Sequence, residues 1–418
     1  MDEAQALNHR ATAAVKWSAL AALVYRVAPP LTFLVLARLL SPQAFGVLST
    51  AMIFISFSQI FWEAGLGKAL IQTRVPVEQA ANVVFWMNAA LGFLIYMVFL
   101  FGAPLAAEFF NCPECSSVLQ VLGLQVIMLA LTSVQQNLFM RELDFRAIFW
   151  ARLFASVTPA LVAVPMALLG FGVWSLVVGT LAGSFVFMLL LWIKSPWRPQ
   201  WSFDRRVAVK LARFGIWVVL ESIGAWLIIW GDSLLLGHYL GMHDLGLYRV
   251  AWTVSFIVFG LLVTPVTQVA YPTFSRLQDD RPALIDSFAK ITRIIACVSL
   301  PAGVGLFVAG PELSHVVLGD KWVGLGLIMG LVGLLNGVAF TLQVNRELYN
   351  AIGRPDLNTK ILVACLVFFV PAYLIAAPLG LGVFTYTRVA VSFLALPIHL
   401  LACSRVLGTS LLYWYRCN

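Results

Sequence analysis

Long apolar runs alternate with short polar turns over the whole length of the chain. Each run is long enough to cross a hydrocarbon core of about 30 Å as a helix. The clearest runs carry no charged residue at all, as in 80–107, 116–140 and 170–193. We expect spans at roughly 17–38, 45–66, 81–104, 117–139, 148–169, 171–193, 214–236, 245–268, 291–310, 323–344, 360–379 and 382–403. The pattern therefore predicts an all-α polytopic membrane protein with about twelve transmembrane helices.

The second half of the chain echoes the first. Three pairs of similar segments occur in the same order, at offsets of 200, 205 and 210 positions. They pair Leu36–Phe57 with Leu236–Ile257, 141–143 with 346–348, and 169–173 with 379–383. Ordered self-similarity of this kind predicts a duplicated unit of about 200 residues.

Six spans per copy is an even number, so both copies enter the membrane from the same side. We therefore expect two parallel six-helix repeats around a central cavity, related by an axis along the membrane normal. The predicted domains are an N-terminal bundle at 1–193, a basic amphipathic cytoplasmic connector at 194–213 and a C-terminal bundle at 214–418. The connector suits a helix lying on an anionic inner leaflet, and a plain basic loop explains its charges equally well.

Composition supports the membrane assignment. The chain is 61% hydrophobic and 11% charged, with a mean hydropathy of +0.91, whereas soluble domains carry about 25% charged residues. The net charge of +8 would suggest nucleic acid in a soluble protein, but its distribution matters more here. Of the 27 Lys and Arg residues, 22 fall in segments on the side of the N-terminus. The positive-inside rule then predicts a multi-pass membrane protein with both termini in the cytoplasm, so the basic residues need no nucleic-acid partner.

Glycines spaced four residues apart occur inside several spans. The spacings are Gly179-x-x-x-Gly183, Gly326-x-x-x-Gly330 and Gly333-x-x-x-Gly337. Small residues at this spacing permit close approach of two membrane helices. We expect helix contacts at these positions.

Cysteines and other reactive residues give little sign of catalysis. Cys112 and Cys115 form the one close pair, which could be a small disulfide, half of a metal site or an incidental pair. No second Cys/His pair completes a zinc set, and the histidines are dispersed. We find no nucleotide-binding motif and no catalytic constellation, so we expect no metal, no cofactor and no enzymatic activity.

Five ionisable residues inside the expected spans are the candidates for a functional site. A basic side chain near mid-membrane costs about 2.5–3.5 kcal/mol on insertion scales, so such residues are expected to face a wet interior. Arg26 falls near the midplane, Arg249 and Arg388 nearer the outer ends of their spans. Of the acids, Glu221 lies inward in the seventh span and Asp232 near its outer end. We expect the three arginines to bind substrate and the two acids to couple transport to an ion or proton.

The repeat distinguishes these residues from the scaffold. Arg26 aligns with Trp226, Arg249 with Ser49 and Arg388 with Val178, so the cations break the pseudo-symmetry. That is expected when the scaffold is shared and the site is particular to one copy. In the alternative reading the arginines snorkel outward, or pair structurally with Glu221 or Asp232.

Three stretches resemble a known family. They are LARLLSPQAFGVLSTAMIFISFSQIFWEAGLGKALIQ (Leu36–Gln72), YPTFSRLQDD (Tyr271–Asp280) and GDKW (Gly319–Trp322). In order and spacing they are similar to the bacterial polysaccharide exporters of the Wzx type, within the multidrug/oligosaccharidyl-lipid/polysaccharide exporter superfamily. Relatives often have fourteen spans, which raises the prospect of a missing C-terminal hairpin.

The resemblance implies flipping of an undecaprenyl-diphosphate-linked oligosaccharide across the inner membrane by alternating access. Its implied partners are that substrate, membrane lipids and other polysaccharide assembly proteins. Arginine suits such a cargo because its planar fork binds phosphate oxygens bidentately. One rival function is a cation-coupled exporter of drugs or other lipids, in which Glu221 and Asp232 would do the work. A second is a membrane glycan polymerase or ligase, which would be expected to carry a large outer catalytic loop.

Overall fold

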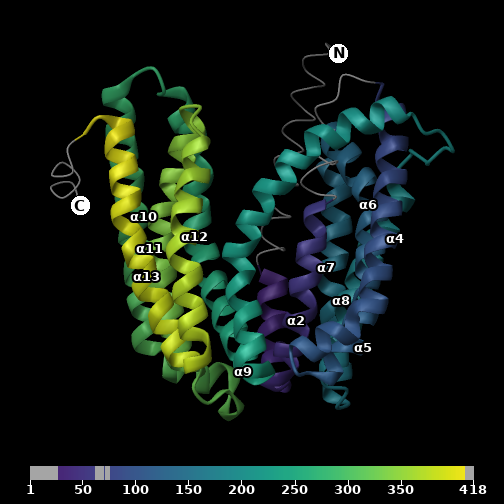
Figure 1. Ribbon diagram of the computed structural model, residues 1–418, viewed down its shortest axis with the longest axis horizontal. Coiled ribbons are helices and arrows are strands. Elements are labelled where there is room, and N and C mark those ends of the chain that lie inside the picture. Colours follow the sequence, from purple (N-terminus) through teal and green to yellow (C-terminus); the bar gives the residue numbers. More distant parts are fainter. Residues whose placement is uncertain (1–26, 62–69, 71–75, 410–418) are drawn as a thin grey trace. The chain divides into compact units, whose positions relative to one another are not determined.

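The computed structural model describes residues 27–61, 70 and 76–409, and all regular structure within them is helical (Figure 1). Nine helices in these ranges are long and apolar enough to cross a membrane, and a shorter apolar helix covers Val27–Leu39. One of the nine, Ser222–Arg276, contains most of the seventh expected span and the whole of the eighth. The all-helical membrane architecture is therefore confirmed, while the count of twelve spans stays a prediction.

The chain forms two compact units, Met1–Trp230 and Gly231–Asn418. In the first unit α4 packs on α6, and α7 packs along α8. Its helices follow the expected spans because each apolar run forms one helix or one pair of helices. After Val27–Leu39 they are α2 (Pro42–Gln59), α4 (Val77–Phe109), α5 (Pro113–Leu122), α6 (Leu124–Arg141), α7 (Phe145–Leu168), α8 (Val173–Lys194) and the first part of α9 (Arg205–Arg276).

The second unit contains the rest of α9 and four further long helices. Helix α10 packs along α11, and α13 contacts both α11 and α12. The elements are α10 (Arg281–Leu313), η2 (Ser314–Leu318), η3 (Asp320–Trp322), α11 (Leu325–Ala351), α12 (Asp356–Ala376), η4 (Ala377–Leu379) and α13 (Leu381–Leu407). A buried cluster that includes Phe259, Phe274 and Phe288 fills the space between them.

Polar residues in the turns start the helices. The Ser41 hydroxyl accepts from the Ala44 amide at the start of α2, where Pro42 occupies the first turn. Asp144 and Asp280 cap α7 and α10 in the same way. Each cap satisfies an amide that has no partner within the helix. The polar turns seen in the sequence are therefore helix starts.

Helix α9 covers two expected spans, with a break between them at Gly241. Its backbone angles there are φ 82° and ψ −176°, which lie outside the helical region. Glycine adopts a positive φ without a steric penalty, so it permits an abrupt change of direction. The polar turn expected near residues 237–244 is therefore a kink at one glycine.

The connector between α8 and α9 is extended and packs against α4. Asn82 on α4 accepts from the Gln200 amide at 2.9 Å, and the Trp86 indole donates to the Gln200 carbonyl at 2.9 Å. The Asp204 carboxylate then accepts from the Arg206 amide at 2.8 Å, which caps α9. The predicted amphipathic segment is thus extended up to residue 204 and continues as the first turns of α9. Its membrane-surface role stays a prediction.

The glycine spacings do mark close helix contacts. A Cβ atom on Gly330 would lie 2.9 Å from Phe307 Cα, and one on Gly337 would lie 2.9 Å from the Ser299 carbonyl oxygen. In the first unit, a Cβ on Gly179 would lie 2.7 Å from Ala163 Cβ. Both the α10–α11 and the α7–α8 contacts therefore depend on the absence of a side chain, as the spacings predicted.

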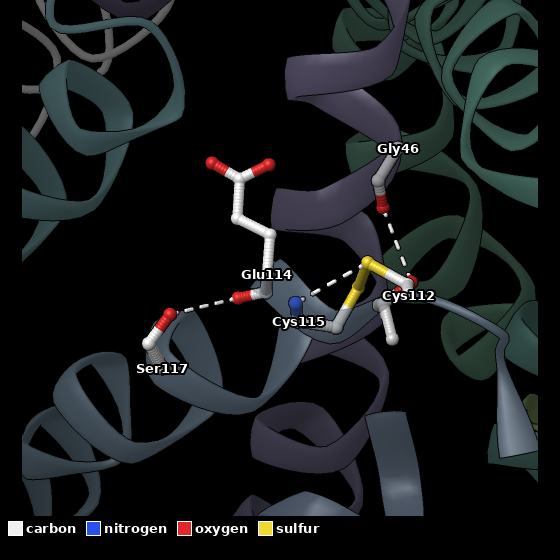
Figure 2. Close-up of a disulfide and its surroundings, with 6 residues drawn as sticks. Gly46, Cys112, Glu114, Cys115 and Ser117 are labelled. Atoms are coloured by element: carbon white, nitrogen blue, oxygen red, sulfur yellow. Dashed lines mark hydrogen bonds between the residues drawn. A yellow bond between two sulfur atoms is a disulfide. The ribbon is translucent and has the colours of Figure 1, made fainter. Parts of the chain in front are cut away.

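Cys112 and Cys115 form a disulfide at the start of α5 (Figure 2). Cys112 is the N-cap residue of the helix, and its sulfur accepts from the Cys115 amide at 3.2 Å. The Glu114 carboxylate points away from the two sulfurs in Figure 2. Of the alternatives left open by the sequence, the structure has the disulfide, and the described residues contain no group of three or more metal-ligating side chains.

Candidate functional site

Two of the five ionisable residues predicted within the spans bind each other. Asp232 on α9 and Arg388 on α13 form an ion pair inside the second unit. Arg249 follows Tyr248 on α9, and its side chain is half-buried. Arg26 lies outside the described residues, and so does the side chain of Glu221, although Glu221 belongs to α9.

The kink in α9 brings Asp232 close to Tyr248. The Tyr248 hydroxyl donates to Asp232 Oδ2 at 2.5 Å, although the two residues are 16 positions apart. In a straight α-helix that separation would be about 24 Å, at 1.5 Å per residue. The contact requires that the chain reverse at Gly241. This glycine is therefore a structural condition for the site.

Arg388 lies among aromatic rings as well as beside the carboxylate. Its guanidinium also donates to the Tyr248 hydroxyl. The guanidinium carbon lies 4.6 Å from the centre of the Trp252 ring, 5.7 Å from that of Tyr248 and 5.6 Å from that of Tyr373. Cations over aromatic faces gain electrostatic stabilisation, which grows as water is excluded. Three aromatic rings therefore stabilise the guanidinium in addition to the single carboxylate.

The carboxylate of Asp232 has a partner for each oxygen. Oδ2 faces Arg388 and Tyr248, and Oδ1 accepts from the Ser233 hydroxyl at 3.0 Å and the Ser233 amide at 2.5 Å. Only 1% of Asp232 and 6% of Arg388 is exposed. Buried charges persist in such surroundings when they are paired and hydrogen-bonded. The six residues Asp232, Ser233, Tyr248, Trp252, Tyr373 and Arg388 form what we call the ion-pair cluster.

The ion-pair cluster has no net charge and no exposed reactive group. The guanidinium is enclosed by its partners, so in this conformation Arg388 presents no open fork to a phosphate group. The carboxylate is likewise occupied, so it offers no open position to a coupling ion. The arrangement can hold α9, α12 and α13 together, and it can release them if the pair separates.

The sequence contained a signal for the aromatic members that our reasoning did not use. In the repeat alignment, Tyr248 faces Leu48, Trp252 faces Met52 and Tyr373 faces Ala163. The test for broken pseudo-symmetry was applied to ionisable residues alone. Extended to aromatic residues with polar atoms, it includes these three positions, together with others such as Tyr239 and Tyr386.

The sequence matches a family described as "Polysaccharide biosynthesis protein" over residues 35–325. Succinoglycan biosynthesis transport protein ExoT of Rhizobium meliloti is 27% identical over 73% of this chain, which spans 62% of the length of ExoT. Lipopolysaccharide biosynthesis protein WzxC of Escherichia coli is 25% identical over 90% of this chain and 76% of its own. Probable flippase AglR of Haloferax volcanii is 30% identical over 37% of this chain and 31% of its own.

Solved structures share the fold. An inward-facing multidrug resistance MATE family transporter of the MOP superfamily superposes with a TM-score of 0.75, at 14% identity, over 92% of this chain and 94% of its own. The lipid II flippase MurJ, in an inward closed conformation, gives a TM-score of 0.75 at 14% identity, over 93% of this chain and 87% of its own. At this identity the likeness establishes the fold and leaves the cargo open.

Proposed function

Because the chain belongs to the polysaccharide biosynthesis protein family of membrane transporters, we propose that it flips a lipid-linked oligosaccharide across the bacterial inner membrane. The proposed cargo is an undecaprenyl-diphosphate-linked repeat unit that moves from the inner to the outer leaflet. The observation that carries the proposal is the family match over residues 35–325.

The relatives support this reading through their own names. ExoT is a succinoglycan biosynthesis transport protein, WzxC a lipopolysaccharide biosynthesis protein and AglR a probable flippase. The structurally similar MurJ is a lipid II flippase. The names have transport, flipping or glycan biosynthesis in common, and those that specify a glycan or lipid specify different ones. The sugar composition of the cargo of this chain is therefore left unspecified.

We propose that transport proceeds by alternating access between two parallel six-span repeats, with both termini in the cytoplasm. The proposal rests on the repeat at offsets of 200 to 210 positions and on the basic residues of the polar segments on the side of the N-terminus. In this scheme the cargo passes through a central cavity that opens to one side of the membrane at a time.

Arg26 and Arg249 are the cations we propose for the diphosphate. Both lie in expected spans, and both break the pseudo-symmetry of the repeat. We assign Arg388 a different role, because its guanidinium is already bound to Asp232 and covered by aromatic rings. We propose that it fixes α13 against α9 and thereby holds the helices of the second unit in place. Glu221 stays a candidate for ion or proton coupling.

The rival within the same fold is a cation-coupled exporter of drugs or other lipids. A MATE transporter with the same fold is an example of this alternative, although the likeness in fold does not decide the cargo. In that scheme Asp232 would bind the coupling cation, but its carboxylate is occupied by Arg388 and Tyr248. The glycan polymerase alternative is not favoured, because the relatives ExoT and AglR are named a transport protein and a probable flippase.

Accumulated intermediates provide the test of cargo. A strain that lacks this protein should accumulate lipid-linked oligosaccharide on the inner leaflet, and the wild-type gene should clear it. Arg249→Ala should leave the accumulation in place at normal protein level, whereas Arg249→Lys should clear part of it, because the charge stays and the planar fork is lost. Normal lipid-linked pools in the deletion strain, with a drug-sensitive phenotype, would reject the proposed cargo.

A further inference from the structure

A basic hollow lies between α12 and α13, away from the ion-pair cluster. Its volume is about 500 Å³. Three cations line it: Arg354 in the turn before α12, Lys360 on the first turns of α12 and Arg405 near the end of α13. The rest of its lining is apolar and includes Ile361 and Ile398. The hollow therefore joins a cationic rim to an apolar wall.

One acidic residue binds two of the three cations. The Asp356 carboxylate accepts from Arg354 at 2.9 and 3.2 Å and from Lys360 at 2.8 Å. Among the described residues, Arg405 has no ion-pair partner, and its side chain is exposed. Three cations and one carboxylate leave an excess of two positive charges at the rim. This excess favours an anion.

The first unit has a hollow at the equivalent place in the repeat. Its lining residues Ala147, Trp150, Ala151 and Phe154 on α7 each correspond, 210 positions later, to a residue that lines the hollow on α12. The hollow is therefore a property of the shared scaffold. It lies where the fifth and sixth spans of each copy come together.

The two hollows differ in chemistry and size. In the first unit Trp150 and Phe154 stack with ring centres 6.1 Å apart, and the hollow measures about 270 Å³. In the second unit Lys360 and Ala364 occupy those positions, which adds a charge and removes both aromatic side chains. Lys194 is the one cation lining the first hollow, against three in the second. The second copy has thus become wider and cationic at a site the first copy fills with aromatic rings.

We propose that the hollow between α12 and α13 binds an anionic phospholipid of the bilayer, with the headgroup phosphate on Arg354, Lys360 and Arg405. The site rests on the membrane orientation proposed above and is independent of the cargo. Guanidinium and ammonium groups donate strong hydrogen bonds to phosphate oxygens. Basic pockets between membrane helices on the cytoplasmic side suit anionic headgroups.

The apolar wall favours a lipid over a free phosphate ion. Ile361 and Ala364 on α12 face the same hollow as Ile398 and Ala402 on α13. All four residues lie in helices long and apolar enough to span the membrane. An acyl chain gains from burial against this wall, whereas a hydrated inorganic phosphate gains nothing from it.

Binding to the purified full-length protein tests the proposal without any transport assay. The protein in a neutral detergent is titrated with phosphatidylglycerol, phosphatidylcholine or inorganic phosphate, and bound lipid is counted by native mass spectrometry. We expect phosphatidylglycerol to bind and phosphatidylcholine to bind much more weakly. A basic residue near an anionic lipid contributes about 1 kcal/mol, which is about fivefold in affinity. Arg405→Ala should therefore weaken binding about fivefold.

Two variants change the site in opposite directions. The double variant Lys360→Trp/Ala364→Phe installs the side chains of the first-unit hollow and should abolish binding. Asp356→Asn removes the competing carboxylate and should tighten binding up to about fivefold, a gain that misfolding cannot mimic. Lys290→Ala breaks a similarly exposed pair, Lys290–Asp286, elsewhere on α10 and should change nothing.

The remaining outcomes decide against the proposal. Unchanged phosphatidylglycerol affinity in both site variants would overturn it. Displacement of the lipid by equimolar inorganic phosphate would assign the hollow to a free ion. Preferential binding of undecaprenyl phosphate would assign it to the cargo. Because no arm measures transport, failure here leaves the proposed flippase function untouched, and failure of the flippase test leaves this site untouched.

Discussion

Removal of one partner from the Asp232–Arg388 pair should destabilise the second unit far more than removal of both. Arg388→Met leaves the Asp232 carboxylate buried without its cation, and Asp232→Asn leaves the guanidinium with only its aromatic and hydroxyl partners. An uncompensated buried charge costs about 3–5 kcal/mol. The double variant replaces both charges by neutral groups of similar size. It should lose less than about 2 kcal/mol, since it leaves no unpaired charge in the interior.

The loss of stability differs between the two single variants because the remaining partners of each charge differ. In Asp232→Asn, the Trp252 ring at 4.6 Å continues to stabilise the guanidinium. A desolvated cation–π contact is worth about 2 kcal/mol, so this variant should lie at the lower end of the range. In Arg388→Met the carboxylate keeps the Tyr248 and Ser233 hydroxyls, which satisfy its oxygens but not its charge. Both single variants should nevertheless exceed the double variant by more than about 1 kcal/mol.

Thermal unfolding of the wild type, the two single variants and the double variant, all purified in one detergent, measures the coupling between the two charges. For a unit of about 190 residues, 1 kcal/mol corresponds to about 2–4 °C in Tm, so each single variant should fall by about 6–20 °C. The exposed pair Lys290–Asp286 is a matched control, for which coupling below about 0.5 kcal/mol is expected. Strict additivity of the two cluster substitutions would refute the reasoning, because additive effects mean that the two charges do not depend on each other.

Three further predictions follow from the packing, the disulfide and the charge distribution. Gly330→Leu should destabilise the α10–α11 contact by more than about 1 kcal/mol, because a Cβ there meets the neighbouring backbone at 2.9 Å, whereas Gly305→Leu has open space and should have little effect on Tm. Cys112 and Cys115 should react with a maleimide only after reduction, and a double Ser variant should lose less than about 3 kcal/mol, since the bridge closes a very short loop. Reporter fusions should report the cytoplasm after Arg405 and the outside at Cys112; the opposite pair of signals would reject the proposed orientation.

The places of the helices could be predicted from the sequence because the bilayer imposes a simple rule. A backbone in hydrocarbon must satisfy its own polar groups, so every span is a helix of about 20 apolar residues. The glycine spacings were informative for a similar reason, since only glycine permits the approach of Gly330 to Phe307 Cα. The exception is α9, where a turn was expected and a kink at Gly241 is present. A single glycine can reverse the chain, and hydropathy does not register that.

The ion-pair cluster was only half predictable. Hydropathy identified Asp232 and Arg388 as charges inside spans, because their positions in apolar runs are unusual. It could not identify them as partners, since Arg388 meets Tyr248 across 140 positions of sequence and the meeting depends on how α9 bends. Pairing was one of the alternatives that the sequence left open. The structure selects it for this pair, and the roles of Arg26, Arg249 and Glu221 stay predictions.

Both special features of the second unit involve positions at which the two copies of the repeat differ. In the first unit, the residues aligned with Asp232, Tyr248 and Arg388 are Thr32, Leu48 and Val178, which cannot form an ion pair. A buried ion pair is a poor way to gain stability, since an apolar core of equal volume serves as well. Its presence in one copy of a duplicated scaffold is therefore better explained by selection for an arrangement that can be broken. Helices α12 and α13 carry members of both the ion-pair cluster and the basic hollow. A change in the contact between these two helices would affect both sites at once, so a bound lipid phosphate and an intact ion pair should stabilise the same arrangement of α12 and α13.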